Sequence, residues 1–406
     1  MTRQELRLLV LSGAVAVPVA ILGVGVALAP ETTDFRCLWT GAAFLLDGRD
    51  PYDLAVWTAA TASLAIDVFG RLNGGNCFGT YPYPLTTAVA MLPLGALPLG
   101  VAAVIWELLI FVGAVAGTAL LARAAALSRS LGLMLVVIVL ASQPFEQNVM
   151  SAQFGGLSLL AVGLLAAPSL GPARAGAGLL LAALKPHVIP LVPLVRARSV
   201  NVGTIAAALA PLALIALVSI VLRPTWPLGW LAELGGQRRD MLGIEVSVWT
   251  LASVVGIPAI GPALAAAGIV PLAVAARRAS DLHVVDLIAV VALGWLIVNP
   301  YGLTASHLAP LAVAWVAILR RAVTPTSSAP LVLALFAVAG VMPWAMYLIR
   351  FDVLAYGGLE VTGALVPLAT AVVLVGALAR STEPRHAPAD ERERGHEPTT
   401  TSPASV

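Results

Sequence analysis

The chain alternates between long uncharged stretches and short clusters of charge. Six stretches contain no Asp, Glu, Lys or Arg: Leu8–Pro30, Leu72–Trp106, Ser199–Leu222, Val246–Ala276, Leu287–Leu319 and Ala322–Ile349. About 20 apolar residues cross a bilayer as a helix, and a lipid-exposed backbone must satisfy its hydrogen bonds within that helix. The pattern therefore predicts an all-α polytopic membrane protein.

Charge clusters, prolines and glycines divide these stretches into about twelve predicted spans. The spans cover residues 8–29, 82–98, 101–121, 131–149, 155–169, 176–195, 202–222, 256–276, 284–299, 303–319, 329–349 and 361–380. Between residues 100 and 200 several segments are short and interrupted by Pro or Gly. A re-entrant hairpin in that region would change the count.

Basic residues in short loops favour the cytoplasm and so predict the sidedness of the spans. Five basic pairs then lie inside, together with both termini: Arg3/Arg7, Arg196/Arg198, Arg277/Arg278, Arg320/Arg321 and Arg380/Arg385. The same arrangement puts Arg123, Arg129 and Arg174 outside. With both termini in the cytoplasm, the number of spans is even.

Three segments differ in composition from the predicted spans: the two external loops, residues 31–81 and 223–245, and the C-terminal segment. The first loop carries five Asp residues and a set of aromatic and apolar side chains, which predicts short interfacial helices. The second contains Trp226 and Trp230. Residues 381–406 are rich in Pro, Thr, Glu and Arg and predict a disordered cytoplasmic tail, which leaves residues 1–380 as one membrane domain.

Composition and missing motifs exclude several classes of protein. The 406 residues are 59% hydrophobic and 11% charged, whereas soluble domains are roughly 45–50% apolar and about 25% charged. A soluble enzyme and a nucleic-acid binder are therefore excluded. The sequence has no P-loop, no Gly-rich dinucleotide fingerprint, no HExxH and no GxSxG, which disfavours an ATP-driven pump or a nucleotide-sugar enzyme. No metal or other cofactor is expected.

The first external loop holds the best candidates for chemistry. Asp34 follows the first span, where a carboxylate at the outer membrane surface can act as a general base toward a hydroxyl. The alternative is an ordinary N-cap of the next helix. Residues 47–53 contain three Asp residues but lack the ligand spacing of a calcium loop, so we interpret them as a plain turn. Cys37 and Cys77 both lie in this loop, on the oxidising side, where a disulfide is compatible with the compartment.

Polar residues within the predicted spans or at their ends are the second source of candidates, because each is costly in lipid without a partner or a function. They are Glu107, Glu146, Gln147, Asn148, Gln153, Lys185, His187, Asn299 and His307. Glu107 and Glu146 have Arg123 and Lys185 as candidate partners inside the bundle. Lys185 either faces a phosphate or extends to the interface. His307 lies at the same predicted membrane face as Asp34.

The order of these segments resembles the polyprenol-phosphate-mannose-dependent mannosyltransferases of glycosyltransferase family 87, integral-membrane enzymes of the GT-C class. The similarity rests on Asp34 to Asp53 at the start of the first loop, on Tyr81-Pro-Tyr-Pro84, on Ala183-Leu-Lys-Pro186 and on Ser306-His-Leu-Ala-Pro310. The segment from Ser151 to Gly155 matches the family's Gly-Gln-x-Asn element in Gln153 alone. Leu85 also departs from the family, which usually has a second Pro there.

The resemblance implies a fold, a reaction and roles for individual residues. It implies a GT-C-like bundle at the cell membrane whose active site faces outward, with a polyprenyl-phosphate sugar as donor and a lipid or glycan as acceptor. Asp34 becomes the general base of an inverting transfer, and His307 assists it or contacts the leaving phosphate. The implied substrate-binding residues are Arg36, Tyr81, Tyr83, Gln153, Lys185 and Asn299.

Two other classes of function remain open at this point. A transporter or lipid flippase would have a similar helix count and few buried charges. Transporters often show two similar halves with broken helices, and no such halves are visible in this sequence. A non-catalytic subunit of a membrane assembly is the third class. The long first loop favours an enzyme.

Overall fold

The computed structural model describes residues 3–28, 33–61, 65–66, 72–73, 80–167, 171–184, 202–240, 248–254, 256–279, 282–299, 308–323, 329–345 and 359–380. Several features predicted from the sequence lie outside these residues: Cys77, Lys185, His187, the pair Arg196/Arg198, His307 and the tail 381–406.

The described chain is helical apart from one short antiparallel pair, β1 (Ala65–Ile66) with β2 (Leu72–Asn73). The first half contains α1 (Arg3–Leu28), α2 (Phe35–Leu46), α3 (Leu54–Thr61), α4 (Leu85–Ala90), α5 (Leu92–Gly95), α6 (Leu99–Ala124), α7 (Arg129–Ala141), α8 (Gln143–Met150), α9 (Gly155–Ala166) and α10 (Pro172–Leu184). The second half contains α12 (Val202–Leu222), α13 (Trp226–Asp240), α14 (Val248–Val254), η3 (Pro258–Ile260), α15 (Gly261–Arg278), α16 (Val284–Val298), α17 (Leu308–Ala322), α18 (Ala329–Phe336), the π-helical η5 (Ala337–Val341) and α20 (Leu359–Ala379).

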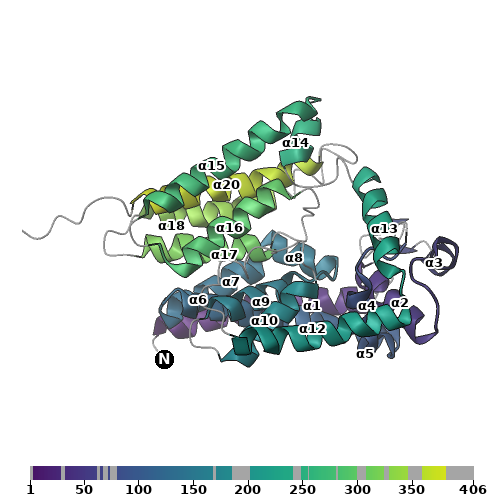
Figure 1. Cartoon of the computed structure of the whole chain (residues 1–406). Helices are drawn as coiled ribbons and strands as arrows, with labels where there is room; N and C mark the ends of the chain where they lie inside the picture. The colour runs from purple at the N-terminus through teal and green to yellow at the C-terminus, as the bar shows by residue number, and fades with distance from the viewer. Residues whose placement is uncertain are drawn as a thin grey trace, which may run out of the picture.

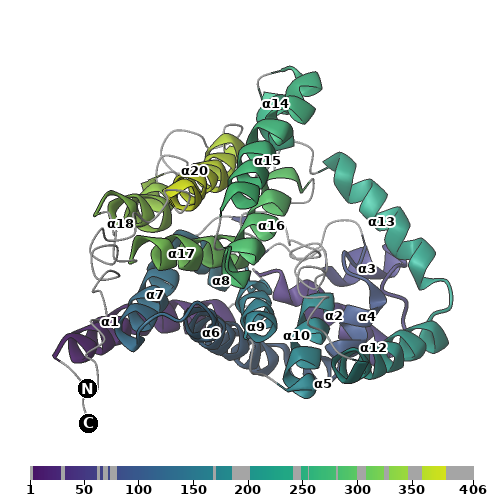
Figure 2. The same ribbon diagram turned by 60° about the vertical axis from the view of Figure 1, so that its left-hand side comes forward.

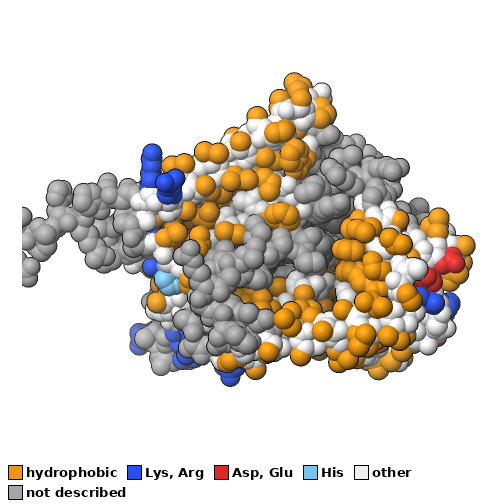
Figure 3. Space-filling model, in the orientation of Figure 1, with side chains coloured by type: hydrophobic (Ala, Val, Ile, Leu, Met, Phe, Trp, Pro, Cys, Tyr) orange, Lys and Arg blue, Asp and Glu red, His pale blue; other side chains and the backbone are white. Residues whose placement is uncertain are grey.

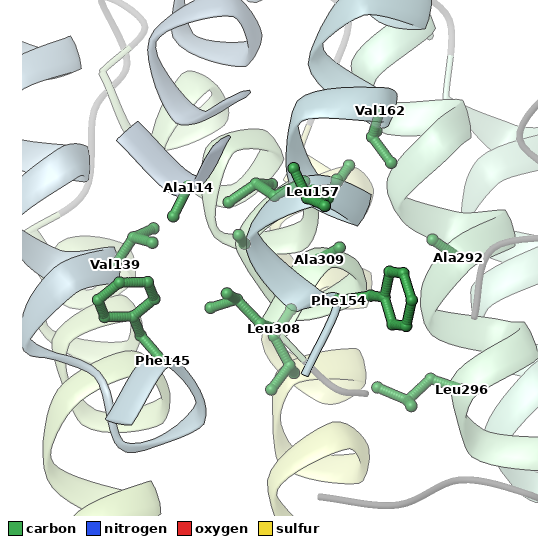
Figure 4. Packing of buried hydrophobic residues seen from close by; sticks show 14 of the residues in the cluster. Ala114, Val139, Phe145, Phe154, Leu157, Val162, Ala292, Leu296, Leu308 and Ala309 are labelled. Carbon is green, nitrogen blue, oxygen red and sulfur yellow. The ribbon is translucent and has the colours of Figure 1, made fainter. Parts of the chain in front are cut away.

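The helices form two layers that share one apolar core (Figures 1 and 2). Helices α1, α6, α7, α9, α10 and α12 form one layer, and α14 to α20 form the other. Figure 4 shows how α9 joins them: its side chains pack toward Ala114 of α6 on one side and toward Ala292 and Leu296 of α16 on the other. Leu308, at the start of α17, lies near Phe154 at the start of α9.

Helices α6 and α9 approach each other closely, and glycines make the approach possible. Gly113 and Gly117 of α6 are four residues apart and face the backbone of Gly156 and Leu159 in α9. Small residues at such spacing let helix backbones approach closely in membranes, where the hydrophobic effect does not drive helix association. This contact fixes the position of the segment just before α9, which carries Gln153.

We expect Gly156→Val to destabilise the protein by about 1–3 kcal/mol, the usual penalty for overpacking. A Cβ at Gly156 would overlap the carbonyl oxygen of Ile110, which is backbone and cannot rotate away. Gly100→Ala is the control because a Cβ there meets nothing within 4 Å. Thermal unfolding in detergent micelles measures both variants. Equal melting temperatures for the two variants would contradict the role of glycine in the α6–α9 contact.

The helices agree with the predicted spans in part. Among the described residues, two helices are long and apolar enough to cross a membrane, Leu99–Ala124 and Pro258–Arg278, or up to four if two bent pairs each count as one. One bent pair is α7 with α8, which turn by 54°. The predicted span 82–98 is wrong, because it divides into the short helices α4 and α5. The described chain is thus helical, with two to four helices that could span a membrane and with broken segments between them.

The break at α4 and α5 reverses the direction predicted for the next helices. Helix α1 ends just before α2, and α6 begins just after α5, which packs against α2. Each helix has 26 residues and is about 39 Å long. Arg3 and Arg123 therefore both lie at the end of the molecule away from α2. Arg129, at the start of α7, follows Arg123 after a short turn and lies at the same end.

Arg174 lies at that end as well, since the other end of its helix contacts α4. The Thr87 hydroxyl in α4 donates a hydrogen bond of 3.1 Å to the Leu184 carbonyl, the last residue of α10. Arg123, Arg129 and Arg174 therefore share an end with Arg3, and the prediction that they lie on the opposite side from Arg3 is wrong. The cause is the misread span 82–98.

The two ends of the molecule differ in charge (Figure 3). Basic side chains gather at the end where α1 begins, and they include Arg277 and Arg278 of α15 and Arg320 and Arg321 of α17. Acidic and basic side chains lie together at the opposite end, which carries α2 and α3, and Asp47 pairs there with Arg49. By the positive-inside rule, this arrangement predicts that the basic end faces the cytoplasm. We refer to the α2 end as the outer end.

We expect a thiol at position 54 to react with a membrane-impermeant maleimide in intact cells, and a thiol at position 323 to react only after permeabilisation. Leu54 of α3 is 59% exposed at the outer end, and Val323 is 40% exposed beside the basic end. Leu54→Cys and Val323→Cys serve as matched reporters. The opposite labelling pattern would place the basic end outside the cell.

The two long external loops pack together at the outer end. Thr80 donates hydrogen bonds from its backbone N–H and its hydroxyl, 3.0 and 2.7 Å long, to the Glu233 carboxylate of α13. Arg223 donates to the Gly48 carbonyl. The segment Trp226–Leu234 bends by 97° from Leu209–Leu222, so α13 lies across the end of the bundle (Figure 1). The first loop forms α2 and α3, which confirms that it contains short helices.

Candidate functional site

Asp34 stands at the N-terminal end of α2 and its side chain does not cap that helix. The residue occupies the N-cap position but makes no side-chain cap hydrogen bond. Its carboxylate oxygen Oδ2 instead accepts a hydrogen bond from the side-chain amide of Gln153, 119 positions later in the sequence. Its backbone N–H donates to the Ser151 carbonyl at 3.2 Å. Asp34 is thus attached to the turn between α8 and α9 through both backbone and side chain.

The α8–α9 turn is a tight backbone structure that points Gln153 toward Asp34. Asn148 anchors it: its side-chain oxygen accepts from Gly155 N–H at 2.7 Å and its carbonyl accepts from Gln153 N–H at 3.0 Å. Ala152 has a φ of 49°, a left-handed conformation that is unfavourable by roughly 1–2 kcal/mol for a residue with a Cβ. The surrounding contacts must therefore hold this turn in place.

Trp106 of α6 makes the contact that holds Ala152. Its indole N–H donates a buried hydrogen bond of 2.7 Å to the Ala152 carbonyl. The indole also stacks on Phe35 of α2, with ring centroids 5.7 Å apart, and meets the edge of Phe154 at 5.0 Å. Trp106 is 2% exposed. One side chain therefore joins α6, α2 and the turn directly behind Asp34.

Tyr83 supplies a neutral hydroxyl beside the same amide. The Gln153 side-chain nitrogen lies 3.5 Å from the Tyr83 hydroxyl, within hydrogen-bond distance. Burial raises the pKa of Tyr83 well above its usual value, and the nearby Asp34 carboxylate raises it further, while the Gln153 hydrogen bond acts in the opposite direction. Tyr83 therefore keeps its proton at physiological pH. Tyr52 fixes its position by donating a 2.6 Å hydrogen bond to the Tyr83 carbonyl.

Tyr81 lies in the same aromatic cluster but faces the protein interior. It is fully buried and its ring packs directly on Gly41 of α2, where a Cβ would overlap it. Burial raises the pKa of Tyr81 well above its usual value. Its hydroxyl has no hydrogen-bond partner within the described part of the chain. The structure therefore shows a packing role for Tyr81, and its predicted contact with substrate stays a prediction.

The remaining predicted residues are not joined to Asp34 by a described contact. Arg36 is 7% exposed and donates a hydrogen bond of 3.1 Å to the Ala60 carbonyl, which ties α2 to the end of α3. Asn299 is 2% exposed and caps the end of α16, in the other layer. His307 and Lys185 lie outside the described residues, although Leu308, next to His307, lies near Phe154 (Figure 4).

The other acidic residues of the first loop form local structure. Asp53 accepts from the backbone N–H groups of Ala55 and Val56 at 3.0 and 3.1 Å and so caps α3. Asp50 accepts from Tyr52 N–H at 2.9 Å, and Asp47 pairs with Arg49. The interpretation of residues 47–53 as a turn is confirmed. Asp34 differs from all three because its carboxylate reaches a distant segment.

Cys37 is in a disulfide, one helical turn after Asp34. Its predicted partner, Cys77, lies outside the described residues. Disulfides form in oxidising compartments. This bond is therefore consistent with an outer end that faces away from the cytoplasm.

The surroundings of the Glu107 side chain also differ from the sequence-based prediction. It is 8% exposed in α6, near Gly23 of α1 and Val149 of α8, and its Oε1 has no partner among the residues described. Arg123 cannot pair with it, because sixteen residues of the same helix, about 24 Å, separate them. That predicted pairing is wrong.

Sequence reasoning missed Trp106, Ala152 and Tyr52, which hold the site together. Trp106 lies next to the conspicuous Glu107 in an apolar helix, and no local pattern distinguishes it from a packing residue. Ala152 had one signal: the resembled family has Gly at this position, and Gly is the residue that a left-handed backbone favours. The remaining contacts join residues too far apart in sequence to be read from a pattern.

Comparisons with known proteins do not assign the chain to a family. No family model matches the chain, and no significant similarity to a curated protein or to a solved structure was found. The site must therefore be interpreted from its own chemistry.

Proposed function

We propose that the protein is a membrane glycosyltransferase that moves a hexose from a polyprenyl phosphate to a lipid or glycan acceptor at the outer end. The resemblance to family 87 makes mannose the proposed sugar and a GT-C-like bundle of about twelve spans the proposed fold. The observation that carries the proposal is the Asp34 carboxylate, which makes no cap bond and is held by the amide of Gln153.

The chemistry of a glycosyl transfer fits this arrangement. The acceptor hydroxyl loses its proton to Asp34 and its oxygen attacks the anomeric carbon of the donor, whose bond to the phosphate oxygen breaks on the opposite face. The polyprenyl phosphate leaves as an anion and the anomeric configuration inverts. Asp34 is half-buried, with one carboxylate oxygen accepting from Gln153. The carboxylate serves as the base in this proposal.

The remaining residues of the proposal act on the substrates rather than on the proton. The neutral Tyr83 hydroxyl is a candidate donor to a sugar oxygen, and Gln153 divides its amide between Tyr83 and Asp34. His307 is proposed near the leaving phosphate, because Leu308 lies close to the turn that carries Gln153. Arg36, Tyr81, Lys185 and Asn299 keep their predicted substrate-binding roles as part of this proposal.

Purified protein in proteoliposomes tests the function. The vesicles are supplied with radiolabelled polyprenyl-phosphate mannose and a glycolipid extract as acceptor. The proposal expects label in the acceptor lipid and an equal amount of free polyprenyl phosphate. A lipid transporter would instead move the donor between leaflets with its sugar–phosphate bond intact. That result, without label in any acceptor, would overturn the enzyme in favour of the flippase.

A further inference from the structure

The left-handed conformation of Ala152 is unfavourable for a residue with a Cβ, and Trp106 is the only residue described as donating a side-chain hydrogen bond to its carbonyl. The orientation of that carbonyl is set by the same backbone torsions that direct the next residue, Gln153. A hydrogen bond to the carbonyl therefore controls where the Gln153 amide points. The indole is buried and held between the rings of Phe35 and Phe154, so it has little freedom to follow a shifted turn.

We propose that Trp106 is a positioning residue for Asp34: its indole N–H holds Ala152 in the left-handed conformation, so that Gln153 donates its amide to the Asp34 carboxylate. The inference rests on the proposed function in giving Asp34 the catalytic proton. Trp106 itself touches neither the carboxylate nor the reacting atoms. It acts through the turn.

The proposed link has a measurable consequence for the protonation of Asp34. A hydrogen bond donated to an ionised carboxylate favours the ionised form, so losing the Gln153 bond raises the pH at which Asp34 titrates. A hydrogen bond to a charged group accounts for a shift of about one pH unit or more.

The described helices that pack on α2 contribute few titratable side chains. Helices α4 and α5, which pack on α2, contain no titratable side chain. Tyr83 precedes α4 and stays neutral, as its raised pKa requires. Arg36 of α2 donates to Ala60, and Glu107 of α6 faces Gly23 of α1.

Trp106→Phe removes the indole N–H and keeps an aromatic ring between Phe35 and Phe154. We expect the titration midpoint of Asp34 to rise by about one pH unit, and the acid limb of any transfer activity to move with it. The midpoint is measured by infrared spectroscopy on the full chain, as the protonated-carboxyl band that disappears in Asp34→Asn. This readout needs neither donor nor acceptor. It therefore separates failure of this inference from failure of the proposed function.

A second-site change distinguishes positioning from a general loss of structure. Glycine adopts the left-handed conformation without penalty, so Ala152→Gly should keep the turn in place without the indole. We expect Trp106→Phe/Ala152→Gly to return the Asp34 midpoint toward the wild-type value. Trp249→Phe is the matched control, since it removes a 2.7 Å indole bond to the Val298 carbonyl in the other layer. It should leave the midpoint unchanged.

Two results would overturn the proposal: a wild-type midpoint in a folded Trp106→Phe protein, or a double variant that remains shifted as far as the single one. If Trp106→Phe does not fold, Ala152→Val replaces it, because a β-branched residue disfavours the left-handed conformation while the indole stays in place. That variant should raise the midpoint in the same direction. An unchanged midpoint would again contradict the link.

Discussion

Asp34→Asn is expected to lower the rate of hexose transfer by about 10²–10⁴-fold, the usual contribution of a positioned general base. Asparagine keeps the size of the side chain and an oxygen that accepts from the Gln153 amide, so the local structure should survive. The amide cannot take the proton of the acceptor hydroxyl. The measurement is the initial rate of transfer from polyprenyl-phosphate mannose by the purified variant, alongside its melting temperature.

Asp53→Asn is the matched control for the loss of a carboxylate in the same loop. Asp53 caps α3 through backbone N–H groups, and asparagine is an equally good cap. We expect near-wild-type transfer. If Asp34→Asn is folded and transfers at the wild-type rate, Asp34 is not the base. A loss in Asp53→Asn alone would move the role to that residue.

Asp286→Ala is expected to destabilise the protein by about 3–5 kcal/mol, because it leaves two arginines without their shared carboxylate. Asp286 is fully buried at the start of α16, and Arg321, at the end of α17, is 4% exposed. The Asp286 Oδ2 accepts from Arg321 at 2.6 Å and from Arg320 at 3.0 Å. Denaturant unfolding in detergent micelles, followed by tryptophan fluorescence, measures the change.

Two comparisons test whether the buried charge is the cause. Asp47→Ala breaks an ion pair whose side chains are about half exposed, and such pairs contribute only about 0–1 kcal/mol. Asp286→Leu/Arg321→Leu replaces the buried pair by apolar groups, which is often close to neutral, while Arg320 is 22% exposed and can reach water. We expect the double variant to be more stable than Asp286→Ala. The reverse order would mean that lost packing, rather than an unpaired charge, destabilises the single variant.

The outer end owes its structure to contacts that no single segment predicts. The Asp47–Asp53 turn could be read directly, because Gly, Pro and Asp form turns through local hydrogen bonds. The same rules made an N-cap the plain alternative for Asp34. Only packing brings the Gln153 amide to that carboxylate. A contact between residues 119 positions apart cannot be predicted from the local sequence pattern. The sequence therefore identified the candidate base, and the tertiary structure identified its partner.

In the arrangement of the helices, too, the sequence predicted one part and only the packing decided the rest. Apolar length predicted helices such as α1 and α6, because lipid requires a backbone that satisfies its own hydrogen bonds. Residues 82–98 are just as apolar, yet they fold into α4 and α5 against α2. An apolar side chain is equally stable against protein and against lipid, so composition alone cannot tell a span from a folded-back segment.

The sequence by itself predicted a helical protein with segments apolar enough to span a membrane, where most of its helices run, and that Asp34 stands at the start of a short helix in the first loop. These properties depend on local hydrophobicity and charge. The tertiary structure alone decided that Arg123, Arg129 and Arg174 share an end with Arg3, and that Trp106 fixes the turn carrying Gln153. Those properties depend on which helices pack together, because glycines allow α6 and α9 to approach and a left-handed alanine persists only where the surrounding structure holds it.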